Sequence, residues 1–241
     1  ADAQQRQENQ VKAIRSFIAQ RVDVIAFSPV VESGWDTVLR EAKNAKIPVI
    51  LTDRAVNVAD KSLYTSFIGS DFVEEGRRAG RWLLEHAKKN PNRNYNIVEL
   101  QGTVGSAPAN DRKAGFAEVI KGDPKLKIIR SQTGDFTRAK GKEVMEAFLK
   151  SEGKNIGVLY AHNDDMAIGA IQATEAVKLI TGIGETLLGR LMVYDALEMS
   201  YRTVRIRKHP DTIEVTGNWS ALPGLYAAIA AAVREIYPQI H

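Results

Sequence analysis

The stretch LYAHNDDMAIGA, residues 159–170, joins the end of an apolar run to a polar cluster and then to small apolar residues at helical spacing. This pattern predicts a strand, a polar corner and the start of a helix. In an open α/β sheet such a corner lies at the carboxyl end of a strand, where ligand crevices form. Asn163 offers one acceptor and two donors, which suits a hydroxyl group. Because Asn and Asp also cap helices, we expect Asp164 or Asp165 to cap this helix and Asn163 to face a ligand.

Outward from this stretch, strand-like apolar runs alternate with amphipathic segments along the whole chain. Strands are expected at residues 22–31, 47–52, 64–69, 96–101, 127–131, 155–160, 189–194 and 212–216. Helices are expected at residues 4–20, 35–45, 74–88, 111–121, 137–150, 166–179, 197–205 and 222–237, with Trp82 and Leu83 facing inward. A strand about every 30 residues with a helix between is typical of a parallel sheet with helices on both faces. We therefore predict an α/β fold with parallel, doubly wound sheets.

The composition is that of a soluble globular protein and excludes several classes of function. The chain has 241 residues, of which 44% are hydrophobic and 26% charged, and a net charge of +4. Basic residues are scattered except for a local excess at 202–208, which does not indicate a nucleic-acid partner. The longest alanine-rich apolar run, 227–233, is far shorter than the roughly 18 residues of a membrane span, so we expect no membrane insertion.

No residue pattern points to catalysis, a metal or a cofactor. Cysteine is absent, which excludes disulfides, thiolate nucleophiles and cysteine-ligated zinc. The four histidines have no paired spacing, so we expect no metal site. The segment TGIGETLLG at 181–189 matches neither glycine-rich phosphate loop. No nucleophile lies beside a base, and we predict no catalytic residue and no cofactor.

Polar and aromatic residues follow the predicted strands at the point where each strand ends. They are Asp53, Arg54, Asp111, Arg112, Asp135, Phe136, Asn163 and Asp195, with Asp111 and Arg112 opening a helix. Charged planar groups bind neighbouring hydroxyls as forks, and an aromatic ring stacks on the apolar face of a sugar. A single Asp–Arg pair is more simply explained as a surface ion pair worth under about 1 kcal/mol. Four aligned strand ends favour carbohydrate binding without catalysis.

Seven motifs within residues 1–173 resemble bacterial periplasmic sugar-binding proteins of ABC transporters, in the ribose and galactose branch. The motifs are QENQVKAIRSFIAQ, SPVVESGWDTVLREAK, IPVILTDR, VELQGTVGS, NDRKAGFAE, SQTGDFTRAKGKEVME and YAHNDDMAIGAIQA. The resemblance implies a two-lobed, type I periplasmic-binding-protein fold that closes on one monosaccharide of the galactofuranose, pentose or hexose type. It also implies a periplasmic location and an ABC-transporter permease as partner. The implied sugar contacts are Asp53, Arg54, Arg112, Phe136 and Asn163.

The chain departs from this family at both ends, where the resemblance implies further strands. We expect an incomplete first lobe of residues 1–70 with 219–241, and a second lobe of residues 71–218. The family's first strand would lie beside residues 22–29. Its loss would leave unpaired backbone groups along that edge. We therefore expect self-association through it.

Residues 175–211 also resemble the C-terminal part of sulfur-carrier adenylyltransferases. That resemblance carries no active site, because the nucleotide loop and the zinc cysteines are missing. The same segment fits the sugar-binding pattern in outline, which implies Asp195 as a sugar contact and Asn218 at the last hinge. Two alternatives stay open at this point. One is the effector-binding core of a LacI-type regulator, which the lack of a helix-turn-helix before Gln4 disfavours; the other is a chimeric or engineered chain containing an inactive adenylyltransferase fragment.

Overall fold

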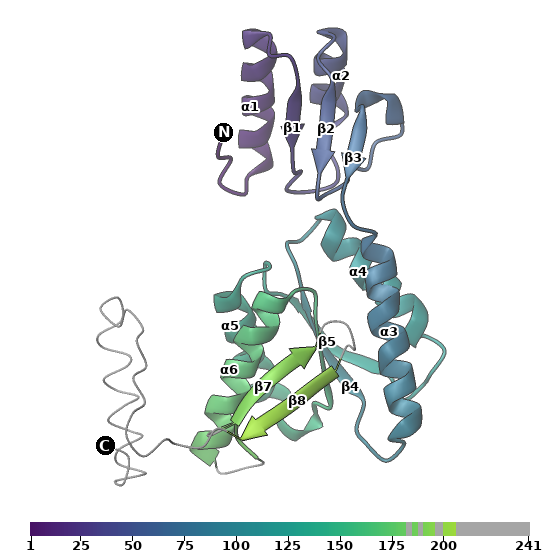
Figure 1. Ribbon diagram of the computed structural model, residues 1–241, viewed down its shortest axis with the longest axis vertical. Coiled ribbons are helices and arrows are strands. Elements are labelled where there is room, and N and C mark those ends of the chain that lie inside the picture. The colour runs from purple at the N-terminus through teal and green to yellow at the C-terminus, as the bar shows by residue number, and fades with distance from the viewer. Residues whose placement is uncertain (182–184, 188–189, 196–199, 206–241) are drawn as a thin grey trace, which may run out of the picture. The chain divides into compact units, whose positions relative to one another are not determined.

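The computed structural model describes residues 1–181, 185–187, 190–195 and 200–205 (Figure 1). It divides into two compact units, Ala1–Thr186 and Leu187–His241. The strand predicted at 212–216, the helix predicted at 222–237 and Asn218 lie outside the described residues. The predicted division into two lobes stays a prediction, since one lobe would include residues 219–241.

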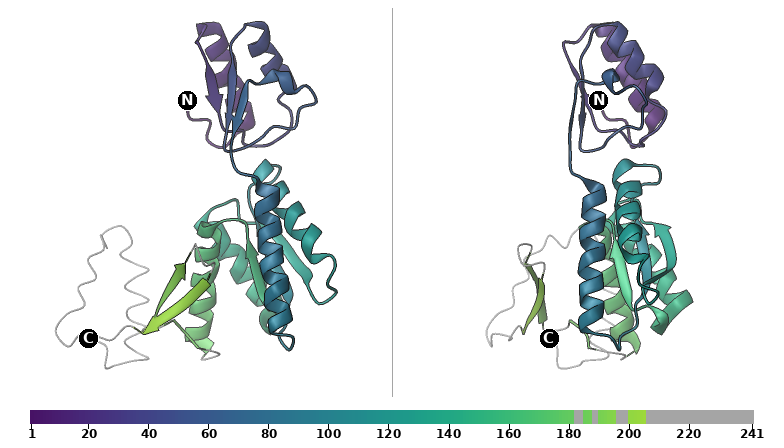
Figure 2. Two further views of the ribbon diagram at one scale, coloured as in Figure 1. Left: turned by 45° about the vertical axis from the view of Figure 1, so that its right-hand side comes forward. Right: turned by 90° about the vertical axis from the view of Figure 1, so that its right-hand side faces the viewer.

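The first unit begins with a three-stranded parallel sheet in the order β1-β2-β3. Its elements are α1 (Gln7–Gln20), β1 (Ile25–Phe27), α2 (Asp36–Asn44), β2 (Val49–Thr52), the 3-10 helix η1 (Lys61–Leu63) and β3 (Ser66–Ile68). Helices α1 and α2 pack against each other and lie on the same side of this sheet (Figure 2). The run predicted as one strand over 22–31 is a strand only in its centre.

The core of this first sheet lies beneath α1 and α2. Trp35, Leu39 and Leu51 are fully buried there. Along β2, buried Val49 and Leu51 alternate with half-buried neighbours, as expected of a sheet covered chiefly on one face.

The same unit contains a second three-stranded parallel sheet, in the order β5-β4-β6. Its elements are α3 (Phe72–Lys89), β4 (Asn96–Gln101), α4 (Ala107–Ile120), β5 (Lys127–Thr133), α5 (Arg138–Glu152), the 3-10 helix η2 (Gly153–Asn155), β6 (Val158–Ala161) and α6 (Asp164–Thr181). Because β4 is the central strand, its carboxyl end lies between those of β5 and β6.

Helices cover both faces of β4, which confirms the predicted doubly wound arrangement. Ile97 packs in one cluster with residues of α3 and α4, and Val98 and Leu100 pack in another with residues of α5 and α6. The side chain of Leu83 faces this core, as predicted. Trp82 was predicted to face inward as well, but it is 47% exposed and stacks on His86. The prediction was wrong because the buried face of α3 passes through its glycines and Leu83 instead.

In the second unit, β7 (Arg190–Asp195) and β8 (Ser200–Arg205) form an antiparallel pair. Arg190 pairs with Arg205 and Asp195 with Ser200. The helix predicted at 197–205 is therefore wrong over residues 200–205. Tyr201, Thr203 and Val204 are β-branched or aromatic residues that suit a strand once an antiparallel partner is available.

None of the helices in the described part of the chain is long and apolar enough to cross a lipid bilayer.

Glycines bring the backbones of α3 and α4 into direct contact. A Cβ atom added to Gly115 would lie 2.0 Å from the carbonyl oxygen of Val73, and one added to Gly76 would lie 2.2 Å from that of Arg112. Any larger residue would push the helices apart. Since Arg112 belongs to α4, this contact also sets where its side chain emerges relative to α3.

We expect Gly115→Ala to lower the free energy of unfolding by about 1 to 3 kcal/mol, the usual result of overpacking a close contact. Gly122→Ala is the matched control, because a Cβ there would meet nothing within 4 Å. Urea denaturation of both variants measures the difference. Equal stability of the two variants would contradict the close helix contact.

Candidate functional site

The turn after β2 fixes Asp53 and Arg54 at the end of the first sheet. Asp53 has φ 61° and donates its backbone N–H to the carbonyl of Ile68, 2.8 Å away. The guanidinium of Arg54 donates through Nη1 to the carbonyl of Val30 at 3.1 Å. The Arg54 side chain is only 16% exposed, whereas that of Asp53 is 66% exposed, with Oδ2 lying 3.8 Å from Nε of Arg54. The turn thus holds a half-buried cation with its remaining donors available.

Phe136 follows β5 in a conformation that bulky residues rarely adopt. It has φ 57°, and Asp135 before it has φ 51°. Such backbone strain persists only where the surroundings enforce it, and it gathers at functional sites. Here the Phe136 ring lies against the backbone of Gly102, the residue directly after β4. A Cβ atom on Gly102 would lie 1.9 Å from Cζ of the ring, so only glycine leaves room for it.

Two arginines from different elements flank this ring. Cζ of Arg54 lies 5.6 Å from the Phe136 ring centroid, and Cζ of Arg112, from α4, lies 6.0 Å from it. Both distances are in the range of cation–π attraction. The structure therefore brings together Arg54, Arg112 and Phe136, which are far apart in the sequence. This is the predicted convergence of strand ends.

Arg112 is held by two residues of α3 that the sequence analysis missed. Its Nε donates to Oε2 of Glu75 at 2.9 Å, Nη2 lies 2.8 Å from the same oxygen, and Cζ lies 4.6 Å above the Phe72 ring. Asp71 caps this helix by accepting from the backbone N–H of Glu74. The sequence did contain a signal for the start of α3, because Asp71 is a typical N-cap residue and Glu74 and Glu75 are acidic residues of the first turn. The helix carrying Arg112 begins at Ala107, four residues before the predicted start at Asp111.

Asn163, and neither of the two aspartates after it, caps α6. Its Oδ1 accepts from the backbone N–H of Met166 at 3.1 Å, and its Nδ2 donates to the carbonyl of Phe136 at 3.0 Å. The prediction that Asp164 or Asp165 caps and leaves Asn163 free was wrong, because those aspartates are the first residues of the helix itself. Asn163 still has one N–H and one lone pair to offer. It also ties α6 to the loop that presents Phe136.

A buried polar pair underlies the carboxyl ends of β4 and β6. Glu99 and His162 have fully buried side chains, with Nε2 of His162 3.2 Å from Oε1 of Glu99. Burial raises the pKa of Glu99, but hydrogen bonds from His162 and Ser131 outweigh it, so the net pKa is lowered. Burial, reinforced by the charge of Glu99, raises the pKa of Tyr160. The lone carboxylate in the apolar strand NIVELQ was the sequence signal for this pair, and it was missed.

Two predicted site residues cannot be placed with the others. Asp195 is the last residue of β7, in the second unit, and its side chain is not described. Asn218 lies outside the described residues. Within the described part of the chain, no group of three or more His, Cys, Asp or Glu residues is suited to hold a metal ion.

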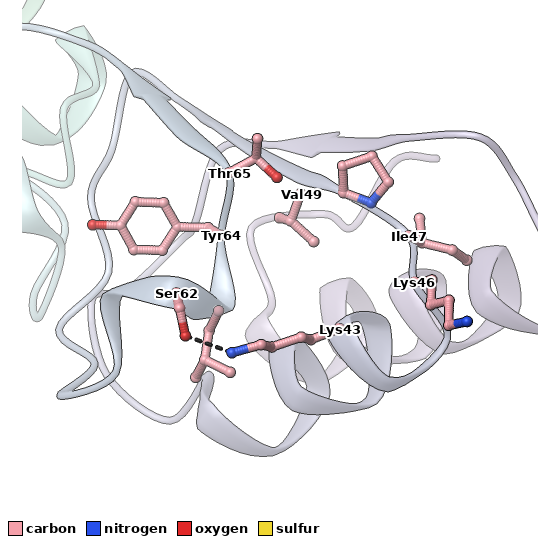
Figure 3. A pocket seen from close by; sticks show the side chains of 9 residues that line it. Lys43, Lys46, Ile47, Val49, Ser62, Tyr64 and Thr65 are labelled. Carbon is pink, nitrogen blue, oxygen red and sulfur yellow. Dashed lines mark hydrogen bonds between the residues drawn. The ribbon is translucent and has the colours of Figure 1, made fainter.

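A separate pocket lies at the opposite, amino-terminal end of β2 (Figure 3). Lys43 lines it, but its Nζ already donates to the Ser62 hydroxyl and lies 3.7 Å from a carboxylate oxygen of Asp60. Ligands of parallel α/β sheets bind beyond the carboxyl ends of the strands. The candidate site is therefore the cluster of Arg54, Arg112 and Phe136, which we call the strand-end site.

Strained turns, half-buried arginines and an aromatic ring lie at the carboxyl ends of parallel strands, the position at which open α/β sheets bind small molecules. Residues 1–235 match the model of the periplasmic binding protein domain, and the chain belongs to that family. Its fold is the type I periplasmic-binding-protein fold. The galactofuranose-binding protein YtfQ of Escherichia coli strain K12 is 52% identical over 220 residues, which cover 90% of this chain and 67% of that protein.

Solved structures agree with this assignment. A protein from Mycobacterium smegmatis in complex with β-D-fucofuranose is 61% identical, with a TM-score of 0.70 over 73% of this chain and 58% of that one. The periplasmic binding protein of the arabinose ABC transporter from Shewanella sp. ANA-3, bound to α- and β-L-arabinofuranose, is 57% identical, with a TM-score of 0.69 and the same coverage of each chain. The chain thus spans less than two thirds of the length of these solved relatives.

A short segment has a different relative, as the sequence analysis expected. The probable adenylyltransferase/sulfurtransferase MoeZ of Mycobacterium tuberculosis is 58% identical over 66 residues, which are 27% of this chain and 16% of that protein.

The cap assignment predicts that Asn163→Ala lowers the free energy of unfolding by about 1 to 2 kcal/mol, because the N-terminus of α6 loses its acceptor. Asp165→Ala is the control: its exposed carboxylate pairs with Arg138 at 2.7 Å, and we expect a loss below about 1 kcal/mol. Chemical denaturation of both variants measures their free energies of unfolding. If Asp165→Ala lost more stability than Asn163→Ala, the aspartates and not Asn163 would cap α6.

Proposed function

We propose that this chain is a solute-binding protein that captures a monosaccharide at the strand-end site for uptake by an ABC transporter. The observation that carries the proposal is the convergence of Arg54 and Arg112 on the ring of Phe136. A half-buried aromatic ring flanked by cationic forks is suited to a sugar, whose ring has an apolar face and a rim of hydroxyls.

Each residue has a distinct role in this proposal. Phe136 stacks on the sugar ring, and the free donors of the two arginines bind pairs of hydroxyls. Asp53, with its exposed carboxylate, accepts from a hydroxyl. Asn163 contributes its remaining N–H and lone pair. Asp195 and Asn218 stay predictions.

The relatives favour a furanose as the ligand. Two of them are described with fucofuranose or arabinofuranose bound, and a third by its galactofuranose binding. We therefore propose that this chain binds a sugar with a five-membered ring. We also propose that its partner is an ABC-transporter permease and that its location is the periplasm. Family membership favours this binding role over catalysis and over the regulator core.

We expect Arg54→Ala and Arg112→Ala each to weaken sugar binding by about 2 to 4 kcal/mol, because a hydroxyl pair loses a charge-assisted fork. Titration calorimetry with D-galactose, D-fucose and L-arabinose measures the change. Arg78→Ala is the control, because Arg78 is 72% exposed and pairs with Glu74 within α3. Its affinity should equal that of the wild type.

Unchanged affinity in both site variants would show that the sugar binds elsewhere. A wild-type chain that binds none of the three sugars would remove the proposed ligand class.

We also propose that the chain self-associates through the open edge of β1. Within the described residues β1 pairs only with β2, and the N–H of Ile25 donates to Pro48 on that side. Because successive residues of a strand point their backbone groups to opposite sides, Val24 and Ala26 turn theirs to the open edge. Val24 is also 48% exposed. An uncovered edge of this kind is a template for another strand.

Sedimentation velocity over a range of concentrations should show a dimer or larger species. The Val24→Lys variant should contain more monomer, because a charged side chain at an edge opposes pairing with another strand. Hydrogen exchange supplies the second measurement: the Ala26 amide should be protected only in the associated form. A monomer at all concentrations with a protected Ala26 amide would mean that another segment covers the edge.

A further inference from the structure

The loop after β1, residues 28–35, makes two hydrogen bonds to the segment that begins α4. The backbone N–H of Glu32 donates to the carbonyl of Gly105 at 2.8 Å. The Oε1 atom of the same residue accepts from Nδ2 of Asn110, 2.9 Å away. Gly105 lies two residues before α4, and Asn110 lies in the first turn of that helix. Glu32 therefore binds α4 at its start through both its backbone and its side chain.

Hydrogen bonds also fix this loop to the helix and core of the first sheet. The backbone N–H of Val30 donates to Oε1 of Gln10, on α1, at 2.9 Å. The indole Nε1 of Trp35 donates to the carbonyl of Val31 at 2.7 Å, and the Trp35 side chain is fully buried. Glu32 thus extends toward α4 from a loop that is itself held in place.

The loop is connected to both arginines of the strand-end site. The carbonyl of Val30 accepts directly from Arg54. Arg112 lies two residues after Asn110 on α4. The packing of α3 and α4 fixes Arg112 within the second sheet, whereas Glu32 fixes α4 relative to the loop that binds Arg54. The spacing of the two guanidinium groups therefore depends on the bonds of Glu32.

We propose that Glu32 is a positioning residue for sugar binding: its bonds to Gly105 and Asn110 hold α4 where Arg112 and Arg54 can reach one sugar together. The inference rests on the proposed function for its sugar readout. Glu32 acts through the placement of α4 and does not need to touch the sugar itself.

A carboxyl titration tests the position of Glu32 without a sugar. Burial raises the pKa of Asp111, and the negative charges of Glu32 and Asp71 raise it further. Glu32→Gln removes one of these charges and should therefore lower the pKa of Asp111, as measured by carbon-13 NMR of its carboxyl group. Glu41→Gln is the control, because Glu41 pairs with Arg15 of α1, and it should leave this pKa unchanged. An Asp111 pKa that is the same in the wild type and in Glu32→Gln overturns the proposal.

Calorimetry with L-arabinose supplies the functional readout. Glu32→Ala and Asn110→Ala should each weaken binding roughly threefold to tenfold, the factor expected when one hydrogen bond is lost. The double variant should bind no more weakly than either single variant, because both substitutions remove the same contact. Glu32→Gln keeps an oxygen that accepts from Asn110 and should retain most of the wild-type affinity. Glu41→Ala should bind as the wild type does.

Wild-type affinity in both Glu32→Ala and Asn110→Ala contradicts the proposal, and so do losses that simply add in the double variant. If Glu32→Ala does not fold, Asn110→Ala and the carboxyl titration test the proposal in its place. A wild-type chain that binds no sugar contradicts the proposed function, and the titration of Asp111 then shows by itself whether Glu32 lies beside α4.

Discussion

The contact between the Phe136 ring and the backbone of Gly102 is the constraint on which the site depends. Phe136 adopts a left-handed backbone conformation, and the ring reaches its place only because residue 102 has no side chain. Strain of this kind costs about 1 to 3 kcal/mol and must be offset by the surrounding contacts. Asn163 supplies one of them by donating to the Phe136 carbonyl. A relaxed backbone at residue 136 would not place the aromatic ring against Gly102.

The two arginines reach this ring by different structural routes. Arg54 is fixed by the turn after β2 and by its bond to the Val30 carbonyl. Arg112 is placed by the close crossing of α3 and α4, and Glu75 then orients its guanidinium. Both cations are half-buried, so salt screens their attraction to a ligand less than it screens that of fully exposed charges. Their partners leave donors free, which is what a binding protein requires.

Sequence periodicity predicted the second sheet closely, because β4 is a run of mostly apolar residues buried on both faces and the preceding helix α3 is strongly amphipathic. Strand-end positions alone did not predict the approach of Arg54 to Phe136, because these residues follow strands of two different sheets. The family resemblance did, since it implied Arg54, Arg112 and Phe136 as contacts of one sugar. Three features were not predicted. The capping role of Asn163 depends on where α6 begins, which propensity does not fix to one residue. The outward direction of Trp82 depends on helix packing through glycines. The strand at 200–205 depends on a cross-strand partner that local sequence does not show.

The buried Glu99–His162 pair shows a further limit of sequence reasoning, because only the pairing of β4 with β6 brings these two side chains together. A crystal structure of the chain grown with L-arabinose tests the central claim most directly. The account predicts one furanose ring stacked on Phe136, with neighbouring hydroxyls on the guanidinium groups of Arg54 and Arg112. Sugar density elsewhere on the chain, with the Phe136 ring uncovered, would contradict it.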